Sequence, residues 1–163
     1  MKYTAVYISL SILLSCSGKK PETTELRGKP MPSFSLLLQD STTYINTGNI
    51  PMGQPVVLFY FGPHCPYSRA QIEAIIDDIA ALKKIRIYAF TTWPFSELKE
   101  FYRHYQLNKY SNIIVGVDYT NFFGKYFRAQ GVPYMAIYGK NRRLNEAFIG
   151  KIDADQIRKV SEE

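Results

Sequence analysis

The chain has 163 residues, of which 46% are hydrophobic, enough for one domain with a substantial core. Its formal net charge is +6, but the basic residues are scattered among acidic ones and never form a run longer than two. This pattern argues against a nucleic-acid-binding protein, so we expect no nucleic-acid partner.

The N-terminal residues have the pattern of a bacterial export signal. One early lysine precedes an apolar stretch over 5–14, which is too short to span a bilayer. The sequence LLSC at 13–16 resembles a lipobox, in which the cysteine is acylated and becomes the first residue of the mature chain. We therefore expect a signal peptide over 1–15 and a lipid on Cys16. An ordinary secretory peptide with an incidental cysteine is the alternative.

Residues 16–31 predict a tether, because they are polar, rich in Pro, Gly and charge, and lack an apolar period. Fifteen such residues span at most about 50 Å, so the folded domain, 32–163, would stand clear of the lipid surface. Ser17 and the lack of an acidic run after Cys16 favour a membrane-anchored lipoprotein that faces the periplasm.

Strands and helices are expected to alternate along the rest of the chain. Apolar runs predict strands over 33–40, 42–46, 55–61, 85–90, 112–117, 134–139 and around 147–150. Helical periods predict helices over 72–82, 96–105, 121–128 and 153–160, with Ser96 and Asp153 as caps. This order indicates an α/β domain of three layers, with a central mixed sheet and an N-terminal β-hairpin.

The stretch FYFGPHCPYSRAQ, 59–71, places Cys65 between a buried strand and a helix. Pro66 favours the first helical position, so Cys65 should lie at the helix N-terminus. There the free N–H groups of Tyr67 and Ser68, the helix dipole and the Ser68 hydroxyl would favour an anionic, nucleophilic sulfur. A buried, inert cysteine is the alternative. With Cys16 acylated, Cys65 is the only thiol, and no structural disulfide is expected.

The order of elements, Cys65 at a helix start and the run Gly131-Val132-Pro133 before a late strand together resemble the thioredoxin fold. With the export signal, the chain resembles the TlpA-like periplasmic thioredoxins, which are membrane-held thiol–disulfide oxidoreductases. The resemblance covers about Pro32 to the end. It implies that Pro133 is a cis-proline facing the reactive cysteine, and that the backbone of Val132 pairs with an extended substrate peptide.

The chain departs from the family motif, which runs Trp-Cys-x-x-Cys, a basic residue, any residue and Glu. His64, Ser68 and Gln71 stand at the places of the tryptophan, the second cysteine and the glutamate. A serine cannot expel a partner from a mixed disulfide, and an amide cannot accept the proton that a glutamate accepts. His64 is expected to tune the thiolate as a positive or hydrogen-bonding neighbour.

We therefore expect thiol–disulfide exchange through one cysteine, with an external protein or small-molecule thiol completing the cycle. The sequence CPYS at 65–68 resembles the glutaredoxin CPYC site with its second cysteine replaced. A non-enzymatic module that binds thiols or peptides is the alternative. A peroxidase is disfavoured by Gly62, where peroxiredoxins have threonine. A metal site of His64, Cys65 and His104 is disfavoured because adjacent residues chelate poorly, so we expect no metal or cofactor.

Overall fold

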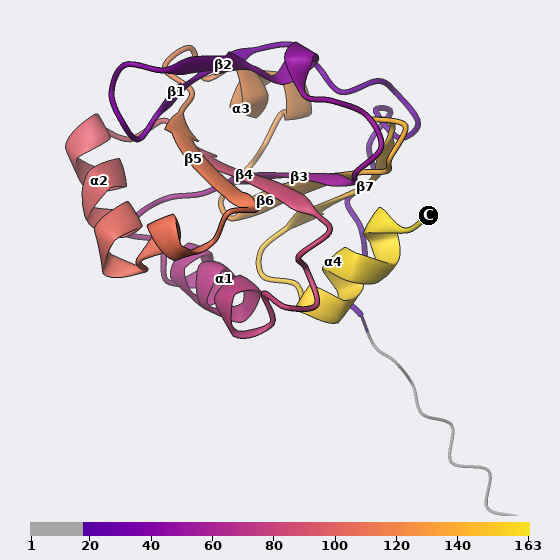
Figure 1. The fold of residues 1–163 in the computed structure, drawn as a ribbon. Helices are drawn as coiled ribbons and strands as arrows, with labels where there is room; N and C mark the ends of the chain where they lie inside the picture. The colour runs from indigo at the N-terminus through magenta and orange to yellow at the C-terminus, as the bar shows by residue number, and fades with distance from the viewer. Residues whose placement is uncertain (1–17) are drawn as a thin grey trace, which may run out of the picture.

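A mixed sheet forms the middle of the protein in a computed structural model that describes residues 18–163 (Figure 1). The seven strands lie in the order β2-β1-β5-β4-β3-β6-β7, and the neighbouring pairs β3–β4 and β4–β5 are parallel, whereas the other four pairs are antiparallel. Their bounds are β1 Ser35–Leu38, β2 Tyr44–Asn46, β3 Val56–Tyr60, β4 Arg86–Thr91, β5 Ile113–Val117, β6 Tyr134–Tyr138 and β7 Leu144–Ile149. The β1–β2 hairpin lies at one edge, as predicted.

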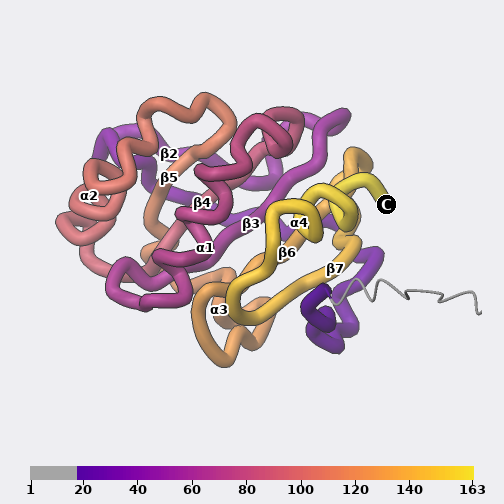
Figure 2. Tube along the Cα trace, turned by 90° about the horizontal axis from the view of Figure 1, so that it is seen from below, coloured from indigo at the N-terminus to yellow at the C-terminus, as the bar shows by residue number. Residues whose placement is uncertain are grey.

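Helices cover both faces of this sheet, which gives the three predicted layers (Figures 1 and 2). Their bounds are α1 Pro66–Asp77, α2 Phe95–His104, α3 Phe122–Phe127 and α4 Ala154–Ser161. Alternate residues of β3 belong to two separate cores. Val57 and Phe59 pack in the core with α1, α2 and α4, whereas Val56 and Leu58 pack in the core with α3 and the N-terminal residues.

The buried, apolar strand β3 places the loop that follows it at the carboxyl end of the parallel strands. Val56–Phe59 have no exposed surface, and β3 pairs with β4 on one side and β6 on the other. Because β3, β4 and β5 are parallel, the loops that follow them all leave the sheet at the carboxyl ends of these strands. The loop containing Cys65 and the loop after β4 are therefore neighbours.

Of the two predicted helix caps, Asp153 is the observed N-cap residue of α4, and Ser96 is not the N-cap of α2. Helix α2 begins at Phe95, and the carbonyl of Pro94 accepts its first backbone hydrogen bonds, so Ser96 lies inside the helix and the prediction of a Ser96 cap was wrong. Asp153 directly precedes α4, but its side chain makes no capping hydrogen bond. Two short 3-10 turns, Thr47–Asn49 and Leu107–Lys109, were not expected because three residues are too few to show a period.

Residues 19–31, which we call the strap, lie along β7 rather than clear of the domain. The Glu22 N–H donates to the carbonyl of Ala147 over 2.7 Å, and the Gly28 N–H donates to that of Leu144 over 2.7 Å. The Leu144 N–H in turn donates to the carbonyl of Lys29 over 3.0 Å. The free edge of β7 thus gives a polar segment its partners, which differs from the expected tether. Both views show this indigo segment beside β7 (Figures 1 and 2).

The signal peptide over 1–15 and the lipid on Cys16 lie outside the described residues and stay predictions. Among residues 18–163, none of the helices combines the length and the apolar character that crossing a membrane requires.

Candidate functional site

Cys65 lies at the start of α1, as the sequence predicted. It is the N-cap residue and Pro66 is the first helical residue. The Cys65 N–H donates to the carbonyl of Gly62 over 3.0 Å, and its carbonyl accepts from the N–H of Arg69 over 3.0 Å. The Cys65 side chain is half-buried, and it forms no capping hydrogen bond with the N–H groups of α1. The backbone therefore fixes the residue while the sulfur stays reachable from outside.

The loop before β6 faces this sulfur. The Cys65 thiol donates to the carbonyl of Val132, with Sγ and O 3.4 Å apart, and the Val132–Pro133 peptide bond is cis, as the resemblance implies. The carbonyl of Pro133 accepts from the Gly150 N–H over 2.7 Å, which ties the loop to the end of β7. The carbonyl of Val132 therefore has the Cys65 thiol as its hydrogen-bond donor.

Three side chains lie close to Gly62. A Cβ atom at this position would lie 3.1 Å from Val132 Cγ2, 3.4 Å from Cys65 Cβ and 3.4 Å from Trp93 Cη2. Only the contact with Val132 Cγ2 is tight, so a larger residue at this position would require a small shift of that side chain.

Trp93 is a site residue that the sequence reasoning missed. It follows β4 at the same end of the parallel strands as Cys65. Its backbone N–H donates to Oγ1 of Thr91 over 3.1 Å. The available signal was the aromatic residue directly after a strand parallel to β3. Tyr67, on the first turn of α1, is 68% exposed.

Ser68, at the place of the second cysteine, is fully buried. Its Oγ accepts a hydrogen bond from the Gly62 N–H over 3.2 Å. We expected this hydroxyl to donate to the sulfur, and the structure instead gives it a role in holding the loop before Cys65. A buried N–H without a partner costs about 1–3 kcal/mol, so this contact helps to fix the loop.

Gln71, at the place of the glutamate, is also fully buried and uses both ends of its amide. Its Nε2 donates to the carbonyl of Ile152 over 3.1 Å, and its Oε1 accepts from the Ile152 N–H over 2.7 Å. A carboxylate could accept but not donate, so it could not replace both contacts. Gln71 thus links α1 to the segment before α4 and offers no proton acceptor.

His64 points to α2. Its Nε2 lies 2.8 Å from Oε2 of Glu97, and its side chain is 62% exposed. Among the hydrogen bonds of residues 18–163, none joins His64 to Cys65. His64 and His104 line one cavity of about 210 Å³ together with Glu97 and Glu100. In this described part of the chain, no three His, Cys, Asp or Glu side chains are arranged to hold a metal ion.

Comparison with known proteins identifies the fold. No family profile and no curated protein matches the sequence. A thioredoxin-like protein from Neisseria meningitidis superimposes with a TM-score of 0.64 at 19% identity, covering 78% of this chain and 84% of that chain. The chain has a thioredoxin-like fold. The predicted fold class is therefore confirmed.

Two further structures share this thioredoxin-like fold. A secreted Mycobacterium tuberculosis disulfide oxidoreductase homologous to E. coli DsbE has a TM-score of 0.64 at 14% identity, covering 78% of this chain and 93% of that chain. The peroxidoxin BcpB from the same organism has a TM-score of 0.67 at 14% identity, covering 82% and 94%. In this fold β3 and β6 are antiparallel neighbours, so the loop after Tyr60 meets the loop before Tyr134. That pairing brings Cys65 to Pro133.

Proposed function

We propose that this thioredoxin-like domain exchanges thiols and disulfides through Cys65 alone, while a lipid on Cys16 holds it at the periplasmic face of a membrane. The observation that carries the exchange is the half-buried Sγ at the start of α1, 3.4 Å from the carbonyl of Val132. The resemblance to TlpA-like proteins and the disulfide oxidoreductase among the similar structures support the same chemistry.

The reaction has two exchange steps. After losing its proton to solvent, the Cys65 sulfur attacks a disulfide of the partner, forms a mixed disulfide and releases the partner's other sulfur as a thiolate. An external protein or small-molecule thiolate then attacks the mixed disulfide on the partner's sulfur. This step forms a disulfide between partner and external thiol, and Cys65 leaves as a thiolate. Ser68 cannot replace the external thiol, because its hydroxyl forms no disulfide.

The surroundings of Cys65 assist both steps. Pro66 and Tyr67 begin α1, which places the sulfur at the N-terminus of this helix. Val132 and Pro133 present backbone to an extended partner, whose N–H would replace the Cys65 thiol as the donor to the Val132 carbonyl. His64 holds the preceding loop through Glu97, and in this way it positions the thiol.

Trapping the mixed disulfide tests the proposal. Incubation of the full-length protein with oxidised glutathione, or with a cysteine peptide activated as a disulfide, should give an adduct on Cys65 that mass spectrometry detects. Addition of a small thiol should release the adduct and allow repeated turnover. Cys65→Ser is the matched control and should give no adduct. A Cys65 that stays unmodified in the folded protein would contradict the exchange reaction.

A second candidate is a non-enzymatic module that binds thiols or peptides. It is favoured by Ser68 and Gln71, whose polar groups serve the structure and leave no internal route to turnover. Peptide binding that survives Cys65→Ala, without turnover by an added thiol, would support this candidate.

A further inference from the structure

The chain is attached to the domain close to the predicted anchor. The Lys19 N–H donates to Oε1 of Gln156 over 2.9 Å, and the Lys19 carbonyl accepts from Nε2 of Gln156 over 2.6 Å. Gln156 lies on α4, so the strap is fixed from its first residue. Cys16 precedes Lys19 by three residues, which span at most about 10 Å.

The acidic side chains of the strap lie beside a hollow of the domain. Glu22 and Glu25 line a hollow of about 500 Å³, which Tyr126 of α3 and Tyr134 of β6 also line. Burial, and secondly the negative charge of Glu22, raise the pKa of Tyr134 to about 12. Glu22 is half-buried beside Tyr134, whereas Glu25 is exposed, so Glu25 offsets one of the positive charges on the outer side of the strap.

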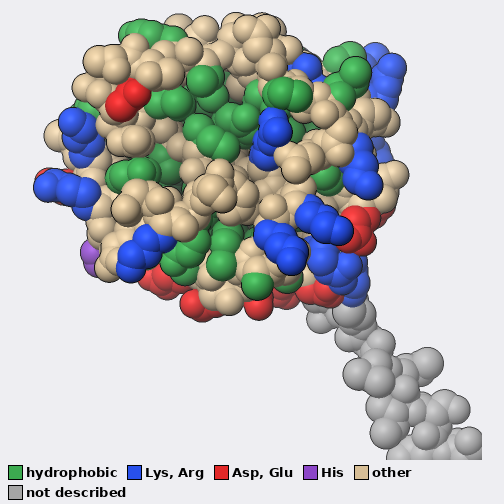
Figure 3. All heavy atoms as spheres, in the orientation of Figure 1, with side chains coloured by type: hydrophobic (Ala, Val, Ile, Leu, Met, Phe, Trp, Pro, Cys, Tyr) green, Lys and Arg blue, Asp and Glu red, His purple; other side chains and the backbone are tan. Residues whose placement is uncertain are grey.

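The basic side chains near the strap are exposed. Lys and Arg side chains gather around the point where the chain leaves the domain (Figure 3). The exposed basic residues of the strap are Lys19, Lys20, Arg27 and Lys29. Arg143 joins them, because its Nη1 donates to the carbonyl of Gly28 over 2.8 Å. Only Arg27 has an acidic partner among these contacts, the mostly buried Glu146 at 2.8 Å.

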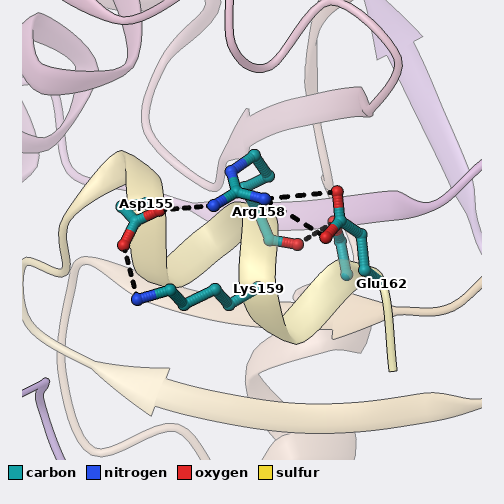
Figure 4. A network of polar contacts seen from close by, with 5 residues as sticks. Asp155, Arg158, Lys159 and Glu162 are labelled. Carbon is teal, nitrogen blue, oxygen red and sulfur yellow. Dashed lines mark hydrogen bonds and ion pairs between the residues drawn. The ribbon is translucent and has the colours of Figure 1, made fainter.

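The neighbouring helix α4 does not offset this charge. Arg158 pairs with Asp155 at 2.7 Å and with Glu162 at 3.2 Å, and Lys159 pairs with Asp155 at 2.8 Å (Figure 4). These two acids and two bases neutralise one another on the helix surface. The outer side of the strap therefore keeps an excess of positive charge.

We propose that the outer side of the strap is a membrane-contacting surface, on which Lys20 and Lys29 bind the headgroups of anionic lipids, whereas Lys19 Nζ lies against Gly150 of the domain. The inference rests on the proposed lipid on Cys16. With only about 10 Å of chain between the acylated cysteine and Lys19, the domain lies on the bilayer instead of reaching about 50 Å from it. Each lysine near an anionic surface increases the local binding constant about fivefold.

This arrangement narrows the class of partners. The Cys65 thiol cannot move farther from the bilayer than the domain's own height plus the short linker. Its partners are therefore thiols or disulfides held close to the same membrane, and not those of proteins that stand far out from it.

Labelling of surface cysteines tests the contact. Lys29→Cys and Lys83→Cys are each made in the Cys65→Ser background and purified as the full processed protein. Each protein is placed in phosphatidylglycerol-containing vesicles, in phosphatidylcholine vesicles and in detergent. Its reaction with a polymer-linked maleimide is then timed. Lys83 is exposed in the turn between α1 and β4 and serves as the matched control.

We expect the Lys29→Cys protein to react several-fold more slowly in the phosphatidylglycerol vesicles than in detergent, while the Lys83→Cys protein reacts equally in both. Gln156→Ala, which frees Lys19, should restore part of the Lys29→Cys rate. Equal rates for the two cysteines in vesicle-bound protein would overturn the proposal. Equal slowing in phosphatidylcholine would overturn anionic lipid as the ligand. Protein that stays in solution with a reactive Cys16 would instead overturn the lipid anchor.

Discussion

The buried and the exposed surroundings of Cys65, which we call its inner and outer sides, differ in whether their polar groups are already hydrogen-bonded. Toward the interior, Ser68 and Gln71 are fully buried and hydrogen-bonded to the backbone of other segments. Toward the surface, Val132 is half-buried and Tyr67 is 68% exposed. The inner side supplies neither a second thiol nor a proton acceptor. Whatever completes a reaction at Cys65 must therefore approach from the outer side.

This difference predicts separate consequences for mutations on the two sides. A substitution of Ser68 or Gln71, on the inner side, leaves a buried backbone group without its hydrogen-bond partner, which costs about 1–3 kcal/mol of stability. A substitution of an exposed residue away from such contacts changes stability by only about 0.5 kcal/mol. Inner changes should therefore alter the free energy of unfolding, and outer changes should alter the reaction with partners.

Ser68→Cys should have the largest effect, because it gives the inner side a resolving thiol. Residues three apart at a helix start can meet disulfide geometry, so an intramolecular disulfide with Cys65 should form. The lifetime of a mixed disulfide should fall sharply, and insulin reduction, absent or weak in the wild type, should rise. Gln71 should hold this activity below that of a dithiol enzyme with a glutamate there. Quenched-flow trapping and insulin turbidity measure the two effects.

Ser68→Ala is the matched control for this change. It removes the acceptor of the Gly62 N–H without adding a thiol. Its mixed disulfide should persist as in the wild type, while its free energy of unfolding falls by about 1–3 kcal/mol. A mixed disulfide that is short-lived in the wild type or in Ser68→Ala would show that some other group resolves it.

Gln71→Glu should lower stability, because only a protonated carboxyl can donate to the carbonyl of Ile152. Burial favours the protonated carboxyl in the folded state and raises its pKa above the ordinary value of about 4.3. The folded-state pKa is then higher than the unfolded one, so stability is lost as pH rises through this range. Urea unfolding should show a loss of about 1–3 kcal/mol that is larger at neutral than at acidic pH.

The exposed Gln130 provides the control for the same change of side chain. Gln130→Glu should leave the free energy of unfolding and its pH dependence nearly unchanged. A Gln71→Glu protein as stable as the wild type at neutral pH would show that the two contacts with Ile152 are dispensable.

Local patterns allowed most of the fold to be predicted. The continuous apolar run of β3 predicted a buried strand, and Pro66 fixed the start of α1 because its effect depends only on neighbouring residues. The partners of buried polar groups could not be predicted in this way. Gln71 and Ile152 are 81 residues apart, and no local pattern specifies that they meet.

The strap and Trp93 escaped prediction for the same reason. The strap has no apolar period, and its order depends on the free edge of β7, a feature of the tertiary fold. Trp93 lies beside Gly62, near Cys65, only because the loops after β3 and β4 emerge together. The sequence thus indicated where Cys65 lies in the fold, but not which side chains surround it.

Trp93→Ala should have the smallest effect on stability and should act on the outer side. Trp93 is half-buried, and its ring lies against Gly62 beside Cys65 and Val132. Without the ring, an apolar peptide that approaches Cys65 loses a contact surface. We expect exchange with a cysteine peptide carrying an aromatic neighbour to slow several-fold. Exchange with a small thiol reagent should remain nearly unchanged.

The same residue reports directly on the site, because it is the only tryptophan of the chain. Formation of an adduct on Cys65 should change the emission of Trp93 in the wild type, and the change should be absent in Cys65→Ser. Trp93→Phe is the matched variant for the exchange measurement, since it keeps an aromatic ring and should recover most of the rate with the aromatic peptide. If Trp93→Ala slowed the peptide and the small reagent equally, the tryptophan would act on the thiol itself. The outer side would then share in the chemistry and not only in binding.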